Sequence, residues 1–394
     1  MRNVKIIPSK SDAHRALICA ALSESPCQVI CSATSKDIEA TKACLQALAD
    51  GWPEMHCGES GSTLRFLLPV MAALGYKAEF YPEGRLPQRP LSPLYEELEA
   101  HGCKMSPQGS EPFTIEGQLE PGDYHIPGNV SSQYISGLLF ALPLLCEDSR
   151  IFIEGNLESA AYVEMTLKVL REFDIRVESI GTGYLIPGGQ SYKGPAEYQV
   201  EGDWSNGCFW LVAGALAEEG LRVTGLNPDS LQGDKEILTI LQEMGAEVSV
   251  DADGITVKGG SLHGTTIDAA QIPDMVPILA VSALAAEGTT EITNAGRLRI
   301  KESDRLATVT EVVMTLGGQI EELPEGLRIT GGKPLQGGRI NAHNDHRIAM
   351  MAAIASLLCK DKVTIDGSDA VKKSYPDFFQ VLGEIGLDKN VERN

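Results

Sequence analysis

A supersecondary unit recurs along this 394-residue chain and constrains its fold more than any other feature. An Ala- and Leu-rich helix is followed by an alternating Val/Ile strand, a second helix of period 3.6 and two further strand patterns. The first helix of each unit is predicted to begin near these residues: His14, Ser62, Ser132, Ser205, Asp274 and His346. The unit reads β-α-β-α-β-β and occurs about six times, which predicts a mixed α/β (α+β) fold.

Turns and helix composition add detail to this fold. The dipeptide turns D-G and E-G and the tripeptide G-T-G separate paired strand patterns, and they predict β-hairpins. Four helices are apolar on nearly every side, so we expect them to be buried: GLLFALPLL, FWLVAGAL, VPILAVSALAA and IAMMAAIASLL. Six units divide into three and three. We expect one domain at residues 9–201 and another formed by residues 1–8 and 202–394, with the two chain crossings as the hinge.

The charge of the chain argues against a nucleic-acid-binding protein. Lys and Arg number 33 against 54 Asp and Glu, for a net charge of −21. Yet cations recur in short Gly- and Ser-rich segments, among them PSKSDAHRA, GESGSTLR, EGRLPQRP, RLRIKESDR, HNDHR and VKKSYPD. Nucleic acid needs a basic face. An acidic chain that gathers cations with hydroxyl groups and glycines is instead expected to build one pocket for small polyanions.

The cysteines and the apolar segments indicate in which cellular compartment the protein is expected and whether it binds a metal or crosses a membrane. The nine cysteines include no C-x-x-C pair, and the N-terminus MRNVKIIPSKSD has no apolar core of a secretion signal. We therefore expect reduced thiols in a cytoplasmic protein. Cys27 and Cys31 resemble half of a zinc site, but no second half follows, so no metal is expected. The most apolar run, residues 135–146, is too short to span a bilayer.

Most of the cationic motifs lie at the predicted helix starts. The unpaired N–H groups and partial positive charge of a helix N-terminus favour phosphate and carboxylate. Hydroxyl and acidic residues at these positions are equally explained as N-caps. That simpler explanation weakens where a cation accompanies the hydroxyl, because a cation opposes the helix dipole. We expect Arg15, Arg65 and Arg347 in first turns of their helices.

Two acidic residues are candidates for proton transfer. Asp274 in QIPDMVP precedes an apolar helix, where an aspartate is usually a cap. Glu302 in IKESDR stands between Lys301 and Arg305, where a salt bridge explains it equally well. Either carboxylate could also accept a proton if neighbouring cations and a substrate tune its pKa.

Taken in order, eight motifs resemble the 5-enolpyruvylshikimate-3-phosphate synthase family: PSKSDAHRA, GESGSTLR, GRLPQRP, GNVSSQ, IPD, RIKESDRL, HNDHR and KKSYPDFF. The resemblance extends over nearly the whole chain. It implies two inverted, barrel-like α/β domains of three β-α-β-α-β-β units each, a monomer, and no cofactor. It also implies transfer of the enolpyruvyl (carboxyvinyl) group of phosphoenolpyruvate to the 5-hydroxyl of shikimate 3-phosphate. Phosphate is released, in the shikimate pathway to chorismate and aromatic amino acids.

The same resemblance implies roles for individual residues. Shikimate 3-phosphate would be held by Lys10, Ser11, Arg15, Ser131, Ser132, Gln133, Ser159, Tyr162, Asp274 and Lys301. Phosphoenolpyruvate would be held by Lys10, Gly61, Arg85, Gln133, Arg305, Arg347 and Lys373. Asp274 would be the base for the 5-hydroxyl, and Lys10 would assist the departure of phosphate. Glu302 and Lys373 would handle the proton on the methylene carbon.

The chain departs from the family pattern at four places. The first motif, IPSKS, lacks the usual glycine between proline and serine, and the chain is shorter than many members. Glu59 stands where asparagine is usual and puts an acid beside an anion site, which bears on the affinity for phosphoenolpyruvate and its mimic glyphosate. Arg297 stands where an asparagine often contacts shikimate 3-phosphate.

Three other functions remain open at this level. A UDP-N-acetylglucosamine enolpyruvyl transferase usually carries a reactive cysteine in the loop that holds Arg85 and Arg89, and none stands here. An RNA-end phosphate cyclase would need contacts to nucleic acid, which the net charge opposes. A non-catalytic binding protein would be expected to lack one of the predicted catalytic residues. None of the four is missing: Lys10, Asp274, Glu302 and Lys373.

Overall fold

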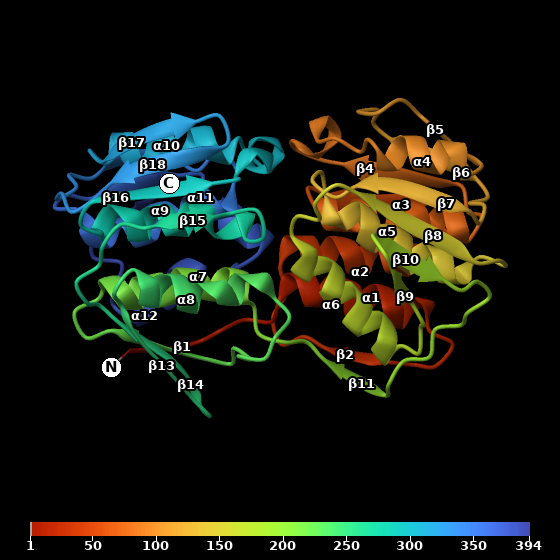
Figure 1. The fold of residues 1–394 in the computed structure, drawn as a ribbon, viewed down its shortest axis with the longest axis horizontal. Coiled ribbons are helices and arrows are strands. Elements are labelled where there is room, and N and C mark those ends of the chain that lie inside the picture. The colour runs from red at the N-terminus through yellow and green to blue at the C-terminus, as the bar shows by residue number, and fades with distance from the viewer. Residues whose placement is uncertain (1) are drawn as a thin grey trace. The chain divides into compact units, whose positions relative to one another are not determined.

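The computed structural model describes residues 2–394, which form two compact units (Figure 1). The N-terminal unit is Lys10–Val200. The C-terminal unit combines the segment up to Ser9 with Glu201–Asn394. Each unit has its own hydrophobic core. Both are built from alternating helices and strands, as the sequence predicts.

The N-terminal unit contains three repeats. The first comprises α1 (Lys10–Leu22), β2 (Gln28–Ile30), α2 (Lys36–Ala49) and β11 (Glu197–Gln199). The second comprises β3 (Glu54–Gly58), α3 (Gly61–Ala73), β4 (Ala78–Pro82), α4 (Leu94–Ala100), β5 (Cys103–Met105) and β6 (Phe113–Gly117). The third comprises β7 (Asp123–Pro127), α5 (Ser132–Ala141), β8 (Ser149–Glu154), α6 (Ala160–Glu172), β9 (Glu178–Ile180) and β10 (Gly183–Ile186).

The C-terminal unit also contains three repeats. The first comprises β1 (Arg2–Lys5), α7 (Trp204–Leu216), β12 (Leu221–Thr224), α8 (Ile237–Glu243), β13 (Glu247–Asp251) and β14 (Gly254–Lys258). The second comprises β15 (Thr266–Asp268), α9 (Val276–Ala285), β16 (Thr289–Thr293), α10 (Arg305–Thr315), β17 (Gln319–Leu323) and β18 (Gly326–Thr330). The third comprises β19 (Gly338–Asn341), α11 (His346–Ala355), β20 (Val363–Asp366), α12 (Phe378–Glu384) and β21 (Val391–Arg393).

Within residues 2–394, the repeats fold as four complete four-stranded sheets and two shorter ones. In β7-β8-β10-β9, the first two strands are parallel and the last two form an antiparallel hairpin, and three other sheets repeat this order. The sheet β11-β2 lacks the final hairpin, because only residues 50–53 separate α2 from β3. In β19-β20-β21 all three strands are parallel. Two of the six predicted units are therefore shortened.

The three predicted hairpins are confirmed. Each closes on a pair of residues separated by a two-residue turn: Ile180 and Gly183, Asp251 and Gly254, Leu323 and Gly326. This loop length gives the tightest connection between antiparallel strands.

The two chain crossings run side by side in the C-terminal unit. The amide of Ser9 donates to the carbonyl of Glu201 at 2.7 Å, and the amide of Asp203 donates to the carbonyl of Ile7 at 2.9 Å. Strand β1 then pairs in parallel with β12, although more than 200 residues separate them along the chain. The N-terminal segment thus completes the first sheet of the C-terminal unit.

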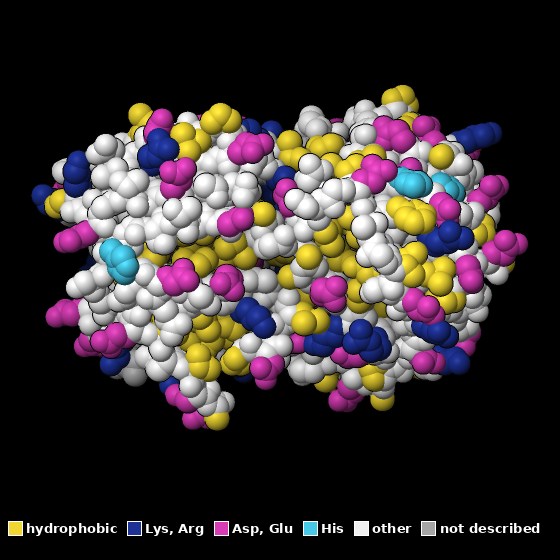
Figure 2. Space-filling model, in the orientation of Figure 1, with side chains coloured by type: hydrophobic (Ala, Val, Ile, Leu, Met, Phe, Trp, Pro, Cys, Tyr) yellow, Lys and Arg dark blue, Asp and Glu magenta, His cyan; other side chains and the backbone are white. Residues whose placement is uncertain are grey.

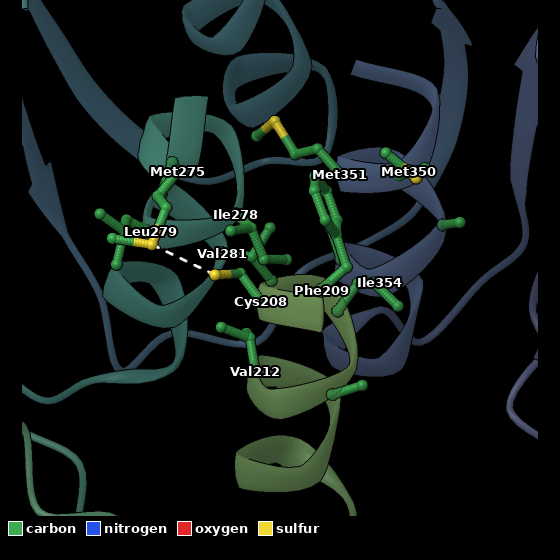
Figure 3. Close-up of a cluster of buried hydrophobic side chains, with 14 of the residues drawn as sticks. Cys208, Phe209, Val212, Met275, Ile278, Leu279, Val281, Met350, Met351 and Ile354 are labelled. Carbon is green, nitrogen blue, oxygen red and sulfur yellow. Dashed lines mark hydrogen bonds between the residues drawn. The ribbon is translucent and has the colours of Figure 1, made fainter. Parts of the chain in front are cut away.

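The apolar helices are buried, as predicted. In the C-terminal unit α7, α9 and α11 pack against one another at the centre of the core. Figure 3 shows Cys208 on α7 directed at Met275, with 3.2 Å between the two sulfur atoms. In the N-terminal unit α3 packs closely on α5. A Cβ at Gly137 of α5 would meet the carbonyl of Arg65, so only glycine permits this approach.

The described surface mixes charges of both signs. On the face shown in Figure 2, Lys and Arg side chains are interspersed with Asp and Glu side chains. No helix of residues 2–394 has the length and apolar character that crossing a membrane requires.

Candidate active site

The predicted site residues are divided between the two units, and most lie at the starts of helices. Helices α1, α3, α5 and α11 begin at Lys10, Gly61, Ser132 and His346. Asp274 lies in a 3₁₀ turn, Pro273–Met275, that leads into α9. Ser131 is also an N-cap, since its hydroxyl accepts from the amide of Gln133. The hydroxyl of Ser131 therefore acts as a helix cap, as the simpler explanation predicts.

One expectation about these helix starts is wrong. Arg15 and Arg65 are the sixth residue of α1 and the fifth of α3, so they lie in second turns, and Arg347 alone of the three is in a first turn. Helical side chains point toward the helix N-terminus, so the guanidinium of Arg15 still reaches back. Its Nη1 donates to the carbonyl of Ser11 at 2.6 Å.

Arg15 is a buried cation whose hydrogen bonds go to neutral groups. Its Nε donates to Thr166 Oγ1 at 2.8 Å, and its Nη2 donates to the carbonyl of Tyr162 at 2.8 Å. Burial lowers the pKa of Arg15 to about 10, and the charge of Asp12 offsets only part of that effect. A buried guanidinium in such surroundings is well suited to an anionic ligand.

The start of α6 lies against Arg15. Ser159, the N-cap of α6, has a left-handed backbone with φ 53° and is buried. A non-glycine residue in this conformation is strained, and such strain concentrates at functional sites. Helix α5 joins the group through Ser136, whose hydroxyl lies 2.8 Å from that of Thr166. The N-terminal unit thus brings the first two turns of α6, and through Ser136 the middle of α5, together around the guanidinium of Arg15.

A second group of cations surrounds Gly61. Gln133 Oε1 accepts from Arg65 Nη1 at 2.9 Å, and Gln133 Nε2 donates to Ser62 Oγ at 2.9 Å. A Cβ at Gly61 would lie 2.6 Å from Arg65 Nη1 and 3.1 Å from Arg89 Nη1. Two guanidinium groups therefore converge on this backbone position. Arg85, which is predicted to bind phosphoenolpyruvate, is exposed at the start of a short 3₁₀ turn in the same loop as Arg89.

Sequence reasoning left Arg65 and Arg89 out of the binding set. The signal was present, because GESGSTLR ends on Arg65 and GRLPQRP contains Arg89 beside Arg85. Lys10 has a partner that was also missed. Its Nζ lies 2.8 Å from Asp37 Oδ2 in the first turn of α2.

The carboxylate of Glu59 packs against the loop that carries Arg85. Gly84 has a left-handed backbone with φ +57°, and a Cβ there would collide with the carboxylate of Glu59. The carboxylate therefore packs directly on the loop backbone, two residues before Gly61. Among the departures from the family pattern, this one places negative charge next to the Gly61 group.

Asp274 lies among three cations in the C-terminal unit. Its Oδ1 is 2.9 Å from Arg305 Nη1 and 3.5 Å from Lys301 Nζ, and its Oδ2 is 3.2 Å from Arg347 Nη2. Burial alone would raise the pKa of Asp274. The charges of Arg347, Lys301 and Arg305 outweigh burial and hold that pKa well below its usual value of 3.8. Asp274 is thus ionised in this structure.

Arg305 is the centre of this cluster. It is only 1% exposed, and its guanidinium contacts three carboxylates. Nε lies 2.8 Å from Asp345 Oδ2, and Nη2 lies 2.8 Å from Glu302 Oε2. Burial opposes the charge, but Asp345, Glu302 and Asp274 more than compensate, so the pKa of Arg305 is raised. The salt bridge predicted for Glu302 is therefore present.

Lys373 lies beside the same cluster. Its Nζ donates to the carbonyl of Asn344 at 2.5 Å. His343 and Asn344 are both left-handed, with φ 50° and 54°, and they turn the chain so that Asp345 caps α11. The HNDHR motif therefore supplies a carbonyl to Lys373 and a carboxylate to Arg305 from consecutive residues.

Arg297 lies near Lys301. Its Nη2 donates to the carbonyl of Ala270 at 3.1 Å. Burial lowers the pKa of Lys301, Asp274 opposes that shift, and Arg305 and Arg297 add to it. The unusual Arg297 thus adds positive charge where the family pattern has a neutral amide. Residues 2–394 hold no group of three or more His, Cys, Asp or Glu side chains suited to a metal.

Together these groups define the class of protein. Clusters of buried or half-buried cations, one of which surrounds the ionised carboxylate of Asp274, suit an enzyme that binds small polyanions and moves protons. Each unit carries such a cluster on its helix starts.

Comparison with known proteins agrees with this class. The family model of EPSP synthase (3-phosphoshikimate 1-carboxyvinyltransferase) matches residues 2–52 and 52–382. A 3-phosphoshikimate 1-carboxyvinyltransferase of Clostridium kluyveri is 43% identical over 97% of this chain and 94% of its own length. The 3-phosphoshikimate 1-carboxyvinyltransferase of Clostridium acetobutylicum is also 43% identical, over 98% of this chain and 95% of its own length. The solved EPSP synthase of Acinetobacter baumannii superposes with a TM-score of 0.81 at 25% identity, covering 98% and 95% of the two chains.

This chain therefore belongs to the EPSP synthase family. The predicted family, the mixed α/β fold class and the predicted activity, a 3-phosphoshikimate 1-carboxyvinyltransferase, are confirmed by these matches.

Proposed function

We propose that the groups of residues around Arg15, Gly61 and Arg305 carry out enolpyruvyl transfer from phosphoenolpyruvate to the 5-hydroxyl of shikimate 3-phosphate. The observation that best supports this proposal is the position of Asp274 between Arg305, Arg347 and Lys301. With its pKa held so low, Asp274 is a weak base. A substrate phosphate or carboxylate would compete for Arg347 and Lys301, and loss of their field would raise the basicity of Asp274. Substrate binding would therefore activate the base.

Binding of shikimate 3-phosphate is assigned mainly to the group around Arg15. Ser11, Ser131, Ser132, Gln133, Ser159 and Tyr162 would supply hydroxyl, amide and backbone groups, and Lys10 and Lys301 would supply charge. The buried guanidinium of Arg15 supports this proposal, because it donates hydrogen bonds to Thr166 and to two backbone carbonyls and so keeps its positive charge available to an anion.

Phosphoenolpyruvate is assigned to the Gly61 group and to the cations of the C-terminal unit. Lys10, Gly61, Arg85 and Gln133 would bind it from one unit, and Arg305, Arg347 and Lys373 from the other. We add Arg65 and Arg89 to the expected set because both guanidinium groups reach Gly61. Cations around a helix N-terminus are favourable for a phosphate that carries two negative charges.

The chemistry then proceeds in two steps. Protonation of the methylene carbon of phosphoenolpyruvate creates an oxocarbenium-like centre, and the 5-hydroxyl attacks it while Asp274 accepts the hydroxyl proton. In the tetrahedral adduct, the C–O bond to phosphate breaks as the methyl carbon loses a proton. Glu302 and Lys373 are assigned to the carbon proton, since both border the Arg305–Asp345 pair. Lys10 assists the departing phosphate.

A phosphate-release assay tests the function. Phosphate should appear only when both substrates are present, without added metal. Asp274→Asn should lower turnover at least about 100-fold, the usual scale for an acid–base group. Asp253→Asn, at the exposed tip of the β13–β14 hairpin, is the matched control. Release of phosphate with UDP-N-acetylglucosamine in place of shikimate 3-phosphate would contradict the assignment.

The expected domains are part of the same proposal. Residues 9–201, and 1–8 with 202–394, would act as two domains, with the crossings near Pro8 and Gly202 as the hinge. Since the expected ligands of each substrate are divided between the units, shikimate 3-phosphate should favour a more compact form. Small-angle scattering should show a smaller radius of gyration on its addition, and an unchanged radius at saturation would contradict the hinge.

The remaining expectations concern the setting in which the enzyme works. We propose a cytoplasmic monomer that needs no cofactor and binds neither nucleic acid nor membrane. The net charge of −21 supports the part of this proposal that concerns nucleic acid. Light scattering at assay concentration tests the monomer, because a dimer would double the mass.

A further inference from the structure

Four buried polar side chains form one continuous hydrogen-bonded chain across three helices of the N-terminal unit. His14 Nδ1 on α1 lies 2.7 Å from Thr41 Oγ1 on α2. Thr41 Oγ1 lies 2.6 Å from Thr63 Oγ1 on α3, and Thr63 Oγ1 donates to Ser60 Oγ at 2.7 Å. All four side chains are buried, so solvent does not compete for these bonds.

Donors and acceptors follow one order along this hydrogen-bonded chain. A hydroxyl group has a single proton, and that of Thr63 is donated to Ser60, so Thr63 must accept from Thr41. The proton of Thr41 is then used as well, so Thr41 must accept from His14. His14 therefore carries its proton on Nδ1. Burial, followed by the charges of Lys10 and Arg15, holds the pKa of His14 well below 6.5, so the ring is neutral.

His14 is a costly choice if its only role is packing. Its Nε2 is buried and has no hydrogen-bond partner among residues 2–394. An acceptor left unsatisfied in the interior destabilises the fold, and an apolar side chain of similar size would avoid that penalty. The bond that Nδ1 makes to Thr41 is therefore what distinguishes histidine from an apolar residue here.

Both ends of this hydrogen-bonded chain, His14 and Ser60, are adjacent in sequence to residues that are expected to bind substrate. His14 immediately precedes Arg15 and lies one turn after Lys10 on α1. Ser60 is the N-cap of α3 and immediately precedes Gly61, and its hydroxyl also accepts from the amide of Thr63. We propose that His14 is a positioning residue that fixes the N-terminus of α3, and with it Gly61, relative to Lys10 and Arg15. This inference rests on the proposed function of those residues.

The proposal makes a selective kinetic prediction. Phosphoenolpyruvate is assigned to Gly61, whereas shikimate 3-phosphate is assigned mainly to the group around Arg15. Breaking the chain should therefore raise the KM for phosphoenolpyruvate and leave the KM for shikimate 3-phosphate nearly unchanged. A role in folding alone would lower the melting temperature and the yield without separating the two constants.

Matched variants test this at both ends. An asparagine amide places its N–H near the position of Nδ1, whereas a glutamine amide reaches toward Nε2. His14→Gln and Thr63→Val should each raise the KM for phosphoenolpyruvate roughly 5- to 10-fold, the scale of one buried hydrogen bond. His14→Asn and Thr63→Ser should restore most of the affinity. The double variant His14→Gln/Thr63→Val should be little worse than either single one, because both break the same chain. Thr114→Val on β6, outside the chain, is the control.

A measurement on the unmodified protein is independent of activity. The ¹⁵N shifts of His14 should show a protonated Nδ1 and an unprotonated Nε2 that persist well below the usual histidine pKa. An Nε2-protonated ring would overturn the proposal, as would an equal rise in both KM values in the Thr63→Val variant. Failure of the proposed function would instead appear as absent phosphate release from the wild-type protein with a normal His14 spectrum.

Discussion

Arg305 and Asp345 form a fully buried ion pair through two hydrogen bonds. Nε lies 2.8 Å from Oδ2 and Nη2 lies 3.2 Å from Oδ1. Asp345 also accepts from the hydroxyl of Ser303 at 2.9 Å and caps α11 through the amide of Arg347. This single carboxylate thus orients Arg305 directly and Arg347 through the start of its helix, and both are expected to bind phosphoenolpyruvate.

We expect Arg305→Lys to be strongly destabilising. A lysine has one compact ammonium group and cannot bridge Asp345 while also reaching Asp274 and Glu302. Breaking a buried pair of this kind costs about 3–5 kcal/mol, whereas an exposed pair contributes about 0–1 kcal/mol. Arg328→Lys is the control, since Arg328 forms exposed pairs with Glu291 and Glu321. Urea unfolding of both variants measures the difference, and equal midpoints would contradict this account of Arg305.

Glu59→Gln should strengthen binding of the donor. The carboxylate packs on Gly84 next to Arg85, so it opposes the approach of an anion to the Gly61 group. Removing its charge should lower the KM for phosphoenolpyruvate several-fold, since a charge at this range contributes roughly 1 kcal/mol in a partly solvated site. Glu83→Gln, exposed on the same loop, is the control. An unchanged KM would show that water screens Glu59 from the donor.

Gly61→Ala should discriminate between the donor and glyphosate. A Cβ at this position would lie 2.6 Å from Arg65 Nη1, so the guanidinium must shift. We expect inhibition by glyphosate to weaken by a larger factor than the KM for phosphoenolpyruvate rises. Steady-state kinetics with both compounds measures the two factors. Equal factors would mean that Gly61 serves only as the first residue of α3.

Asp234→Asn should make the protein more stable at alkaline pH. Burial, reinforced by the charge of Asp274, raises the pKa of Asp234 to about 6 from 3.8. Folding therefore favours the neutral carboxyl, and the stability it contributes below pH 3.8 is lost as the pH rises through 6. An uncharged asparagine should add about 1–3 kcal/mol at pH 8 and almost nothing near pH 4.

Thermal unfolding of both proteins across this pH range checks the prediction for Asp234. Asp234 lies in the short 3₁₀ helix Gly233–Glu236, and Asp229→Asn, at an exposed position shortly before it, is the control. A difference in melting temperature that is independent of pH would show that ionisation of Asp234 is not its cause.

Local sequence patterns were sufficient for the elements and for the family. Period 3.6 in the helices, alternation in the strands and the two-residue turns depend on interactions between near neighbours, so the hairpins at Gly183, Gly254 and Gly326 were predictable. The absence of a hairpin after α2 was harder to predict. Strand patterns are short, and the regular repeat led to the expectation of a hairpin in every unit. The family motifs were found because each is contiguous in the chain.

The sequence by itself determined the repeating α/β architecture, the buried helices and the residue types of an anion-binding enzyme, because these follow from local periodicity and contiguous motifs. Only the tertiary structure decided the partners of each charge. The packing of helices brings Arg305 to Asp345, which lies 40 residues further along the chain. It also brings the guanidinium of Arg89 close to Gly61, and it connects His14 to Ser60 through two threonines. Side-chain reach and burial fix those pairs, and no spacing along the chain encodes them.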